Sequence, residues 1–352
     1  MAFFRTFLER HMLIGLKRHF SATLAVVALG VGSLAAAPAL AQSSAKKVRV
    51  QIAHGASDSF SMHRALVQMK AELEKDGRFD VRIFPSSQMG NDTEMIETVS
   101  TGDINVVLSP SAFFTKYSKS MSFIELPYVF PSRDVAIKVL GGEWGKKALA
   151  DLQSKGLVGL GYMENGMRHL TNNKKEVVGP TDLSGMKLRT MQVPAHVEFW
   201  NLTGASASGA PFAELYTNLS TGVFDGQENP LAQITSQKFN EVQKYLTLTG
   251  HVYSAYVIAA NKDWWDGLNA DSKKSLQAAF NNASAYQLKI INQEESKQTS
   301  DLKSKGMNIK TLTPAQVGEW MKLAAPMNKK YASQVGQSEY NDFTTAISAA
   351  SK

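Results

Sequence analysis

The alternation of short apolar runs with amphipathic segments constrains the fold of this chain more than any other feature. Strands that alternate with helices form a mainly parallel sheet covered by helices. The first set of predicted elements comprises strands at 48–53, 79–84 and 104–108 and helices at 62–73 and 95–99. The second set comprises strands at 156–162 and 186–191 and helices at 196–202, 213–220 and 234–245. The sequence therefore predicts an α/β protein with two lobes.

A long segment without Pro or Gly follows these sets, from Asp271 to about Lys305. Asp271 and Ser272 are suited to cap its start, and Gly306 is suited to end it. A helix of this length spans about 50 Å at roughly 1.5 Å per residue, which is more than one lobe. We therefore expect it to brace both lobes. A coiled coil is the alternative, but sustained apolar heptads are missing.

The N-terminal 41 residues resemble a secretory signal peptide. Basic residues precede an apolar stretch at about 22–37, and Ala39-Leu40-Ala41 matches the pattern that signal peptidase accepts. The alternative is a membrane anchor, although the apolar run is shorter than the roughly 20 residues of a spanning helix. Met12 is an alternative start codon. We expect a mature chain from about Gln42, located in the periplasm of a Gram-negative bacterium.

Composition excludes several classes of function. The first 41 residues contribute +3 of the formal charge of +7, and the remaining +4 is dispersed without a basic block, which argues against nucleic acid as a partner. The chain has no cysteine, so disulfides, thiol nucleophiles, Cys-bound zinc and a lipid-modified Cys are excluded. We predict no cofactor and no catalytic residues, while a metal that assists ligand binding remains an open possibility.

The segment from Asp182 to Pro230 has the pattern of an anion-binding cleft. Arg189 lies near the end of a predicted strand, and ligands of such sheets bind beyond the carboxyl ends of the strands, here between two lobes. A guanidinium offers two parallel donors to a carboxylate, so Lys187 would not substitute for Arg189. The alternative is an internal ion pair between Arg189 and an acidic residue. An exported hydrolase is disfavoured because the chain has no Gly-x-Ser-x-Gly or His-Glu-x-x-His motif.

The chain resembles the extracytoplasmic solute receptors of tripartite ATP-independent periplasmic (TRAP) transporters, the DctP-type substrate-binding proteins. The resemblance covers residues 48–331 and rests on segments 84–92, 126–128, 165–168, 182–189, 214–216, 225–230 and 238–244. It implies a two-lobed periplasmic-binding-protein-like fold with a long connecting helix. Lobe I is expected at 42–165 plus about 255–294, and lobe II at 166–254 plus about 295–352, with the ligand cleft between them.

The resemblance also implies which residues bind the solute. Arg189 matches the arginine that pairs with the solute carboxylate in that family. Arg168 matches a second arginine at the ligand, with a loop salt bridge as its alternative role. Asn229 matches an amide that closes on the carboxylate, and its alternative is a turn residue before Pro230.

Four further positions are candidates from the same resemblance. Gln192 occupies a position that often faces the solute. His54 ends the first strand and is either a ligand or a structural residue. Glu164 either accepts solute hydroxyls or neutralises Arg168. Phe113, with Pro110, stands where sialic-acid receptors carry an Arg and an acidic residue, so a smaller acid is implied.

The sequence therefore predicts a non-enzymatic receptor for a small organic acid. The candidates are a C4-dicarboxylate and a hydroxy, keto, sugar or aromatic acid. We expect the membrane permease of a TRAP transporter as the partner and a soluble, monomeric mature chain. Delivery to a sensor kinase or chemoreceptor is the alternative.

Overall fold

A ten-stranded mixed sheet runs through residues 47–352, which are the residues that the structure, a computed structural model, describes. The predicted signal peptide lies outside the described residues. The strand order is β2-β1-β3-β9-β4-β7-β5-β6, and β8 pairs with both β4 and β10. The strands are β1 (Val48–His54), β2 (Phe79–Phe84), β3 (Val106–Pro110), β4 (Leu157–Asn172), β5 (Lys187–Thr190), β6 (Ser206–Gly209), β7 (Gly226–Pro230), β8 (Tyr245–Leu248), β9 (Tyr253–Asn261) and β10 (Asn308–Thr311).

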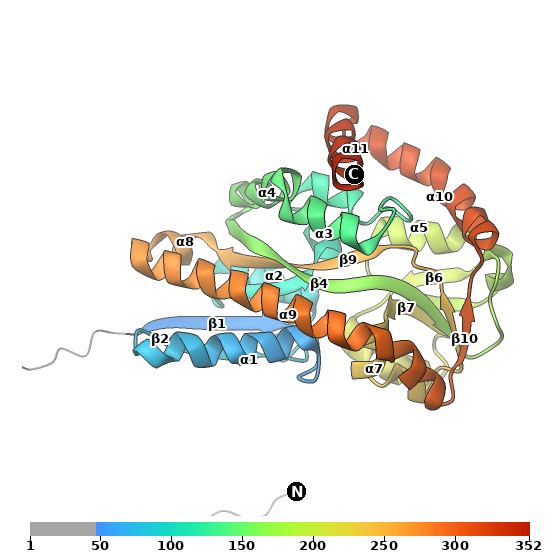
Figure 1. Cartoon of the computed structure of the whole chain (residues 1–352), viewed down its shortest axis with the longest axis horizontal. Helices are drawn as coiled ribbons and strands as arrows, with labels where there is room; N and C mark the ends of the chain where they lie inside the picture. The colour runs from blue at the N-terminus through green and yellow to red at the C-terminus, as the bar shows by residue number, and fades with distance from the viewer. Residues whose placement is uncertain (1–46) are drawn as a thin grey trace, which may run out of the picture. The chain divides into compact units, whose positions relative to one another are not determined.

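Eleven α-helices lie among the described residues, and most of them cover the faces of this sheet (Figure 1). They are α1 (Ser61–Leu73), α2 (Asp92–Thr101), α3 (Arg133–Gly141), α4 (Glu143–Ala150), α5 (Pro194–Leu202), α6 (Leu215–Ser220), α7 (Leu231–Ser236), α8 (Lys262–Asp266), α9 (Ala270–Ser304), α10 (Pro314–Val335) and α11 (Gln337–Ala350). Short 3₁₀ turns connect several of them, including η2 (Ser111–Phe114) and η3 (Lys119–Phe123).

The first lobe confirms the predicted alternation of strands and helices. Strands β2 and β3 pair in parallel with the two edges of β1. Helix α1 buries Met62, Leu66 and Met69 at helical spacing, and these residues share a core with Leu276 and Phe280 of α9. Periodicity therefore predicted α1, which buries one continuous face, and a short apolar run predicted β3, which is buried on both faces.

Strand β4 connects the two lobes. Its first part pairs antiparallel with β9, and its second part pairs antiparallel with β7 and β8. The β4–β9 register shifts between Glu164 and Gly166, and Gly166 has a φ of +119°, a region that favours glycine. The strand therefore bends where it passes from one lobe to the other. In the second lobe, β5 pairs in parallel with β6 and β7.

The predicted long helix is confirmed as α9, which has 35 residues. It begins after Asn269, whose side chain accepts a hydrogen bond from the Ser272 N–H at 2.8 Å. It contacts α1 and β4 on one side and α7 and β10 on the other, so it crosses both lobes (Figure 1). A much shorter helix could contact only one lobe, so the length of α9 is what allows it to cross both.

The C-terminal helix differs from the expected division into lobes. Residues 295–352 were assigned to lobe II, but α11 packs against α3, α4 and η3 of the first lobe (Figure 1). Phe343 is fully buried and stacks on Phe123 with ring centroids 5.6 Å apart. The chain therefore returns to lobe I after α10. An amphipathic helix pattern specifies that one face is buried but not which lobe buries it.

One predicted helix is wrong in its second half. A helix was expected over 234–245, but α7 ends at Ser236 and Tyr245 already begins β8. Lys238 adopts left-handed backbone angles with φ +58°, which no α-helix continues through. The apolar positions of this segment are therefore shared between a helix and a strand.

Candidate functional site

A small cavity lies between the lobes at the carboxyl ends of the strands. Its volume is about 20 Å³. Gly55 directly follows β1, Pro110 ends β3 and Met191 follows β5 closely, as expected for a ligand site in an α/β sheet. The lining residues are Gly55, Asp92, Pro110, Phe113, Asn165, Arg168, Arg189, Met191, Phe212, Asn229, Gln233 and Tyr256.

Arg189 contributes a buried guanidinium to this cavity. The residue is 1% exposed, and its Nε and Nη2 donate to the Ala210 carbonyl at 2.9 and 2.6 Å. Its Nη1 has no hydrogen-bond partner among the described residues. Burial lowers the pKa of Arg189 to about 10, against the attraction of Glu228 and Asp92, so the group stays cationic at neutral pH. The alternative role of Arg189, an internal ion pair with an acidic residue, is not found among the described residues, and Nη1 is available to an anion.

Arg168 is neutralised by Glu228 within the protein. Both are buried, and the guanidinium donates to both carboxylate oxygens and to the Glu228 carbonyl. Burial opposes ionisation of Glu228, but Arg168 and a hydrogen bond from His251 hold its pKa well below its usual value. Thr190 also donates to this carboxylate at 2.9 Å. Arg168 therefore lines the cavity as half of a buried ion pair.

Asn229 lies between this pair and the cavity. Its Oδ1 accepts from Arg168 Nη2 at 3.2 Å, and its Nδ2 donates to Gln227 Oε1 at 2.5 Å. Strand β7 supplies Gln227, Glu228 and Asn229, all of them buried. Asn229 is therefore a strand residue whose amide is oriented by Arg168 and Gln227, and a turn role is excluded.

A further polar network borders the cavity. Gln233 Nε2 donates to Asn165 Oδ1 at 3.1 Å and to the Tyr256 hydroxyl at 2.9 Å. Asn165 Nδ2 in turn donates to Ser254 Oγ at 3.1 Å. The Oε1 atom of Gln233 is buried and has no hydrogen-bond partner among the described residues. The network joins α7 to the strands that cross between the lobes.

Asp92 is a cavity residue that the sequence analysis did not select. It occupies the first turn of α2, where the capping box of Asn91 and Glu94 begins the helix. The Ser109 hydroxyl donates to its carboxyl group. Burial raises the pKa of Asp92, although Ser109 and Arg189 oppose this rise. Acidic residues are common in first turns of helices, so the sequence carried no specific signal for it.

The structure brings four of the seven predicted site residues together. Arg168, Arg189, Asn229 and Phe113 line the cavity. Gln192 does not line it and is exposed on an open part of the surface. Successive side chains of a strand point to opposite faces. The direction of the Gln192 side chain therefore depends on where β5 ends, which is at Thr190.

His54 also lies outside the cavity lining. It is fully buried at the end of β1, and its Nε2 lies 3.1 Å from His63 Nδ1. Burial, followed by the His63 charge, lowers the pKa of His54 to about 3. The imidazole is therefore neutral at physiological pH, and its burial against His63 favours the structural alternative.

Glu164 does not line the cavity and does not pair with Arg168. Its carboxylate accepts from Nε and Nη2 of Arg133, at the start of α3, with both distances 2.5 Å. The expectation that Glu164 neutralises Arg168 is wrong, because Glu228 does so. Sequence proximity suggested the pair, but Glu164 and Arg168 lie on either side of the β4 bend.

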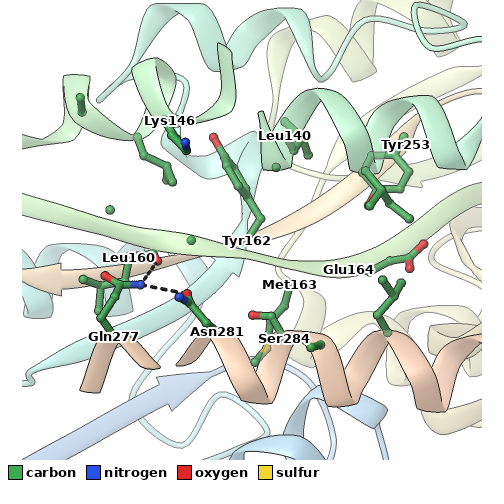
Figure 2. Close-up of a pocket in the computed structure, with 18 of the residues that line it drawn as sticks. Leu140, Lys146, Leu160, Tyr162, Met163, Glu164, Tyr253, Gln277, Asn281 and Ser284 are labelled. Atoms are coloured by element: carbon green, nitrogen blue, oxygen red, sulfur yellow. Dashed lines mark hydrogen bonds between the residues drawn. The ribbon is translucent and has the colours of Figure 1, made fainter. Parts of the chain in front are cut away.

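A wider groove of about 740 Å³ lies along the first part of β4, between α4 and α9 (Figure 2). Gln277 donates to the Leu160 carbonyl at 2.7 Å and to Asn281 at 3.0 Å on its floor. Among the described residues that line it, Lys146 is the one basic side chain, and it is exposed and paired with Glu143. The groove lacks a buried free cation, so the smaller cavity is the better candidate for binding an anion.

A buried polar contact crosses between the lobes near the cavity. Glu125, after η3, lies 3.1 Å from His196 of α5, and Ser111 donates to the same carboxylate at 2.6 Å. Glu125 and His196 are each no more than 2% exposed. The described structure therefore has its lobes in direct contact.

The fold and the cavity together define a two-lobed solute-binding protein with a buried guanidinium in its cleft. Within residues 47–352, no group of three His, Cys, Asp or Glu side chains is arranged to hold a metal ion. The helices of the same residues include none with the length and apolarity needed to span a bilayer.

Comparison with known proteins identifies the family. Residues 52–334 match the profile of the bacterial extracellular solute-binding proteins, family 7, and the chain belongs to this family. The sequence is 33% identical over 293 residues to the 2,3-diketo-L-gulonate-binding periplasmic protein YiaO of Escherichia coli, covering 83% of this chain and 88% of that protein.

Solved structures show the same fold. The sugar acid binding protein DctPAm of Advenella mimigardefordensis, in complex with galactonate, superposes with a TM-score of 0.84 at 32% identity, covering 87% of this chain and 99% of that one. A TRAP periplasmic solute-binding protein of Polaromonas, bound to D-erythronate, gives a TM-score of 0.80 at 32% identity, covering 86% and 98%. The predicted fold class and family are confirmed.

Proposed function

We propose that this protein captures a small organic acid by pairing its carboxylate with Arg189 and delivers it to the membrane permease of a TRAP transporter. The observation that carries the proposal is the Arg189 guanidinium, buried in the cleft with one donor nitrogen unpartnered among the described residues. A buried cation without a counter-charge is unfavourable, and a bound carboxylate supplies both the charge and the acceptors.

The other cavity residues fit a compact acid. Phe113, Met191 and Phe212 supply apolar walls, and the Arg189 guanidinium lies 5.9 Å from the Phe212 ring centroid. Asn229 supplies an amide beside the arginines. The ligands named for the relatives, a diketo sugar acid, galactonate and D-erythronate, are all carboxylates, which supports the same chemistry here.

Binding requires movement of the protein in this proposal. A cavity of about 20 Å³ holds roughly one water molecule, so a four-carbon acid does not fit without the side chains or lobes moving apart. We assign the hinges to 164–166 and 253–256, and the shift of the β4–β9 register between Glu164 and Gly166 supports this assignment. The lobes open for entry and then close around the acid, which excludes water and changes the surface offered to the permease. An unchanged radius of gyration on ligand addition in X-ray scattering would remove this step.

Export and partner choice complete the proposal. The protein acts in the periplasm as a monomer after removal of the signal peptide. N-terminal sequencing of the exported chain tests the removal of the signal peptide. Capture of permease subunits from solubilised membranes by the ligand-loaded receptor supports delivery for transport. Capture of a sensor kinase or chemoreceptor instead would favour the alternative partner.

The experiment that tests the binding function is a thermal-shift screen of the purified protein against organic acids. A ligand at about 100 times its dissociation constant adds roughly 2.7 kcal/mol of stability. We expect a shift with one class of acid and none in Arg189→Met. Arg49→Met is the matched control, because Arg49 is exposed on β1 outside the cavity. An Arg189→Met protein that still responds to the same acid would contradict the proposal.

A further inference from the structure

The cavity has one unpaired cation and a separate set of hydrogen-bond acceptors. The charge of Arg168 is matched by Glu228, so Arg189 is the cation available to a ligand among the lining residues. Asp92 adds a carboxyl group to the same lining. This distribution suits a ligand with a carboxylate at one place and hydrogen-bond donors elsewhere.

Gln233 lines the cavity and has an acceptor without a partner among the described residues. Its Nε2 is directed to Asn165 Oδ1 and the Tyr256 hydroxyl, which fixes the orientation of the amide. Its Oε1 is therefore left without a donor among the described residues, although Gln233 is 0% exposed. A buried acceptor without a donor is unfavourable, so a ligand hydroxyl that donates to it is stabilised.

Asp92 reinforces this selection from the opposite lobe. The Ser109 hydroxyl occupies one oxygen of its carboxyl group. Burial favours the protonated form of Asp92 and raises its pKa, while Arg189 opposes this change. A ligand hydroxyl can donate to this carboxyl when it is ionised or accept from it when it is protonated. A second ligand carboxylate would instead meet a like charge or force Asp92 to take up a proton.

We propose that the solute carries one carboxylate, bound by Arg189, and at least one hydroxyl that donates to Gln233 Oε1, and that Gln233 and Asp92 together select this hydroxy monocarboxylate over a C4-dicarboxylate. The inference rests on the proposed function and assigns its substrate class. A second carboxylate would lose its hydration in the cavity without a free cation to pair with it. This loss disfavours a C4-dicarboxylate relative to a hydroxy monocarboxylate.

The first test compares two acids of equal carbon number by titration calorimetry on the purified protein. D-Erythronate has one carboxylate and three hydroxyls, and succinate has two carboxylates and none. We expect D-erythronate to bind at least tenfold more tightly. Equal or tighter binding of succinate, with both acids lost in Arg189→Met, would overturn the inference and leave the proposed function standing. Absence of binding by any acid would overturn the proposed function itself.

The second test separates the two selecting residues. Gln233→Met removes the acceptor at similar length, and we expect it to weaken D-erythronate tenfold or more and succinate less than threefold. Asp92→Asn removes the charge at constant size, and we expect it to improve succinate relative to D-erythronate by about tenfold. Thermal unfolding without ligand verifies that each variant is folded. Equal effects of either substitution on both acids would contradict a role in selection.

Discussion

Arg189 is held by the Ala210 carbonyl and not by a carboxylate, which separates its role in binding from any role in stability. We expect Arg189→Ala to weaken binding of the acid by roughly 2–5 kcal/mol, because a partner of a desolvated charge pair is removed. Arg189→Lys retains the charge but loses the two parallel donors, so it restores only part of the affinity. Titration calorimetry checks both variants, and full affinity in Arg189→Lys would show that geometry is unimportant.

Arg168, in contrast to Arg189, is expected to contribute to the stability of the protein. Removing it leaves Glu228 buried at 0% exposure without its main counter-charge. We expect Arg168→Met to lower the free energy of unfolding by about 3–5 kcal/mol, measured by urea denaturation. Arg168→Met combined with Glu228→Gln should recover a large part of the loss. If Arg168→Met alone is as stable as the unsubstituted protein, Glu228 has found another partner.

The family resemblance, together with the chemistry of Arg189, located part of the candidate site. Arg189, Arg168, Asn229 and Phe113 lie at the cavity because the second part of β4, the ends of β5 and β7 and the turn after β3 meet there. Asp92 and Gln233 were missed because each begins or lies within a helix, where a polar residue is usual. Their importance depends on which strand end each helix approaches, and that is set by tertiary packing.

Helix α9 is attached to the bend of β4 by one glutamine. Gln287 Oε1 accepts from the Glu164 N–H at 3.0 Å, and its Nε2 donates to the Glu164 carbonyl at 2.7 Å. We expect Gln287→Met to destabilise the protein by about 2–4 kcal/mol, because both backbone groups lose these bonds in a buried place. Gln293→Met, on an exposed position of the same helix, should change stability by less than about 0.5 kcal/mol. Equal melting temperatures for the two variants would contradict this role.

The amphipathic elements of the first lobe were predicted, and the longest strand that is buried on both faces was missed. Strands β1 and β2 and helices α1 and α9 follow their periodicities, whereas β3 is buried at every residue and was predicted from a short apolar run. Strand β9 is buried at every one of its nine residues and shows no alternation, so a periodicity of two could not reveal it. The predicted 156–162 strand is the first part of the 16-residue β4, whose continuation depends on pairing with β7 and β8.

The pH dependence of stability follows from two histidines, the fully buried His54 and the partly buried His169. Burial lowers the pKa of His54 and of His169 from 6.5 to about 3, and a neighbouring histidine adds to the effect in each case. Because the unfolded chain takes up these protons first, stability is fully present above about pH 6.5 and is lost as pH falls toward 3. We expect the midpoint of urea unfolding to fall steadily between pH 6.5 and pH 4. His54→Asn should reduce this slope, and an unchanged slope would exclude His54 as a contributor.

The local pattern of this chain was enough to establish an α/β fold, a helix long enough to reach two lobes and an arginine suited to a carboxylate, because periodicity, length and side-chain chemistry are properties of short segments. Tertiary packing alone decided that Glu228 neutralises Arg168, that Glu164 pairs with Arg133, and that α11 packs on the first lobe. Ion pairs and burial depend on distances between residues that are remote in the chain. Those distances exist only after the strands have been ordered in the sheet.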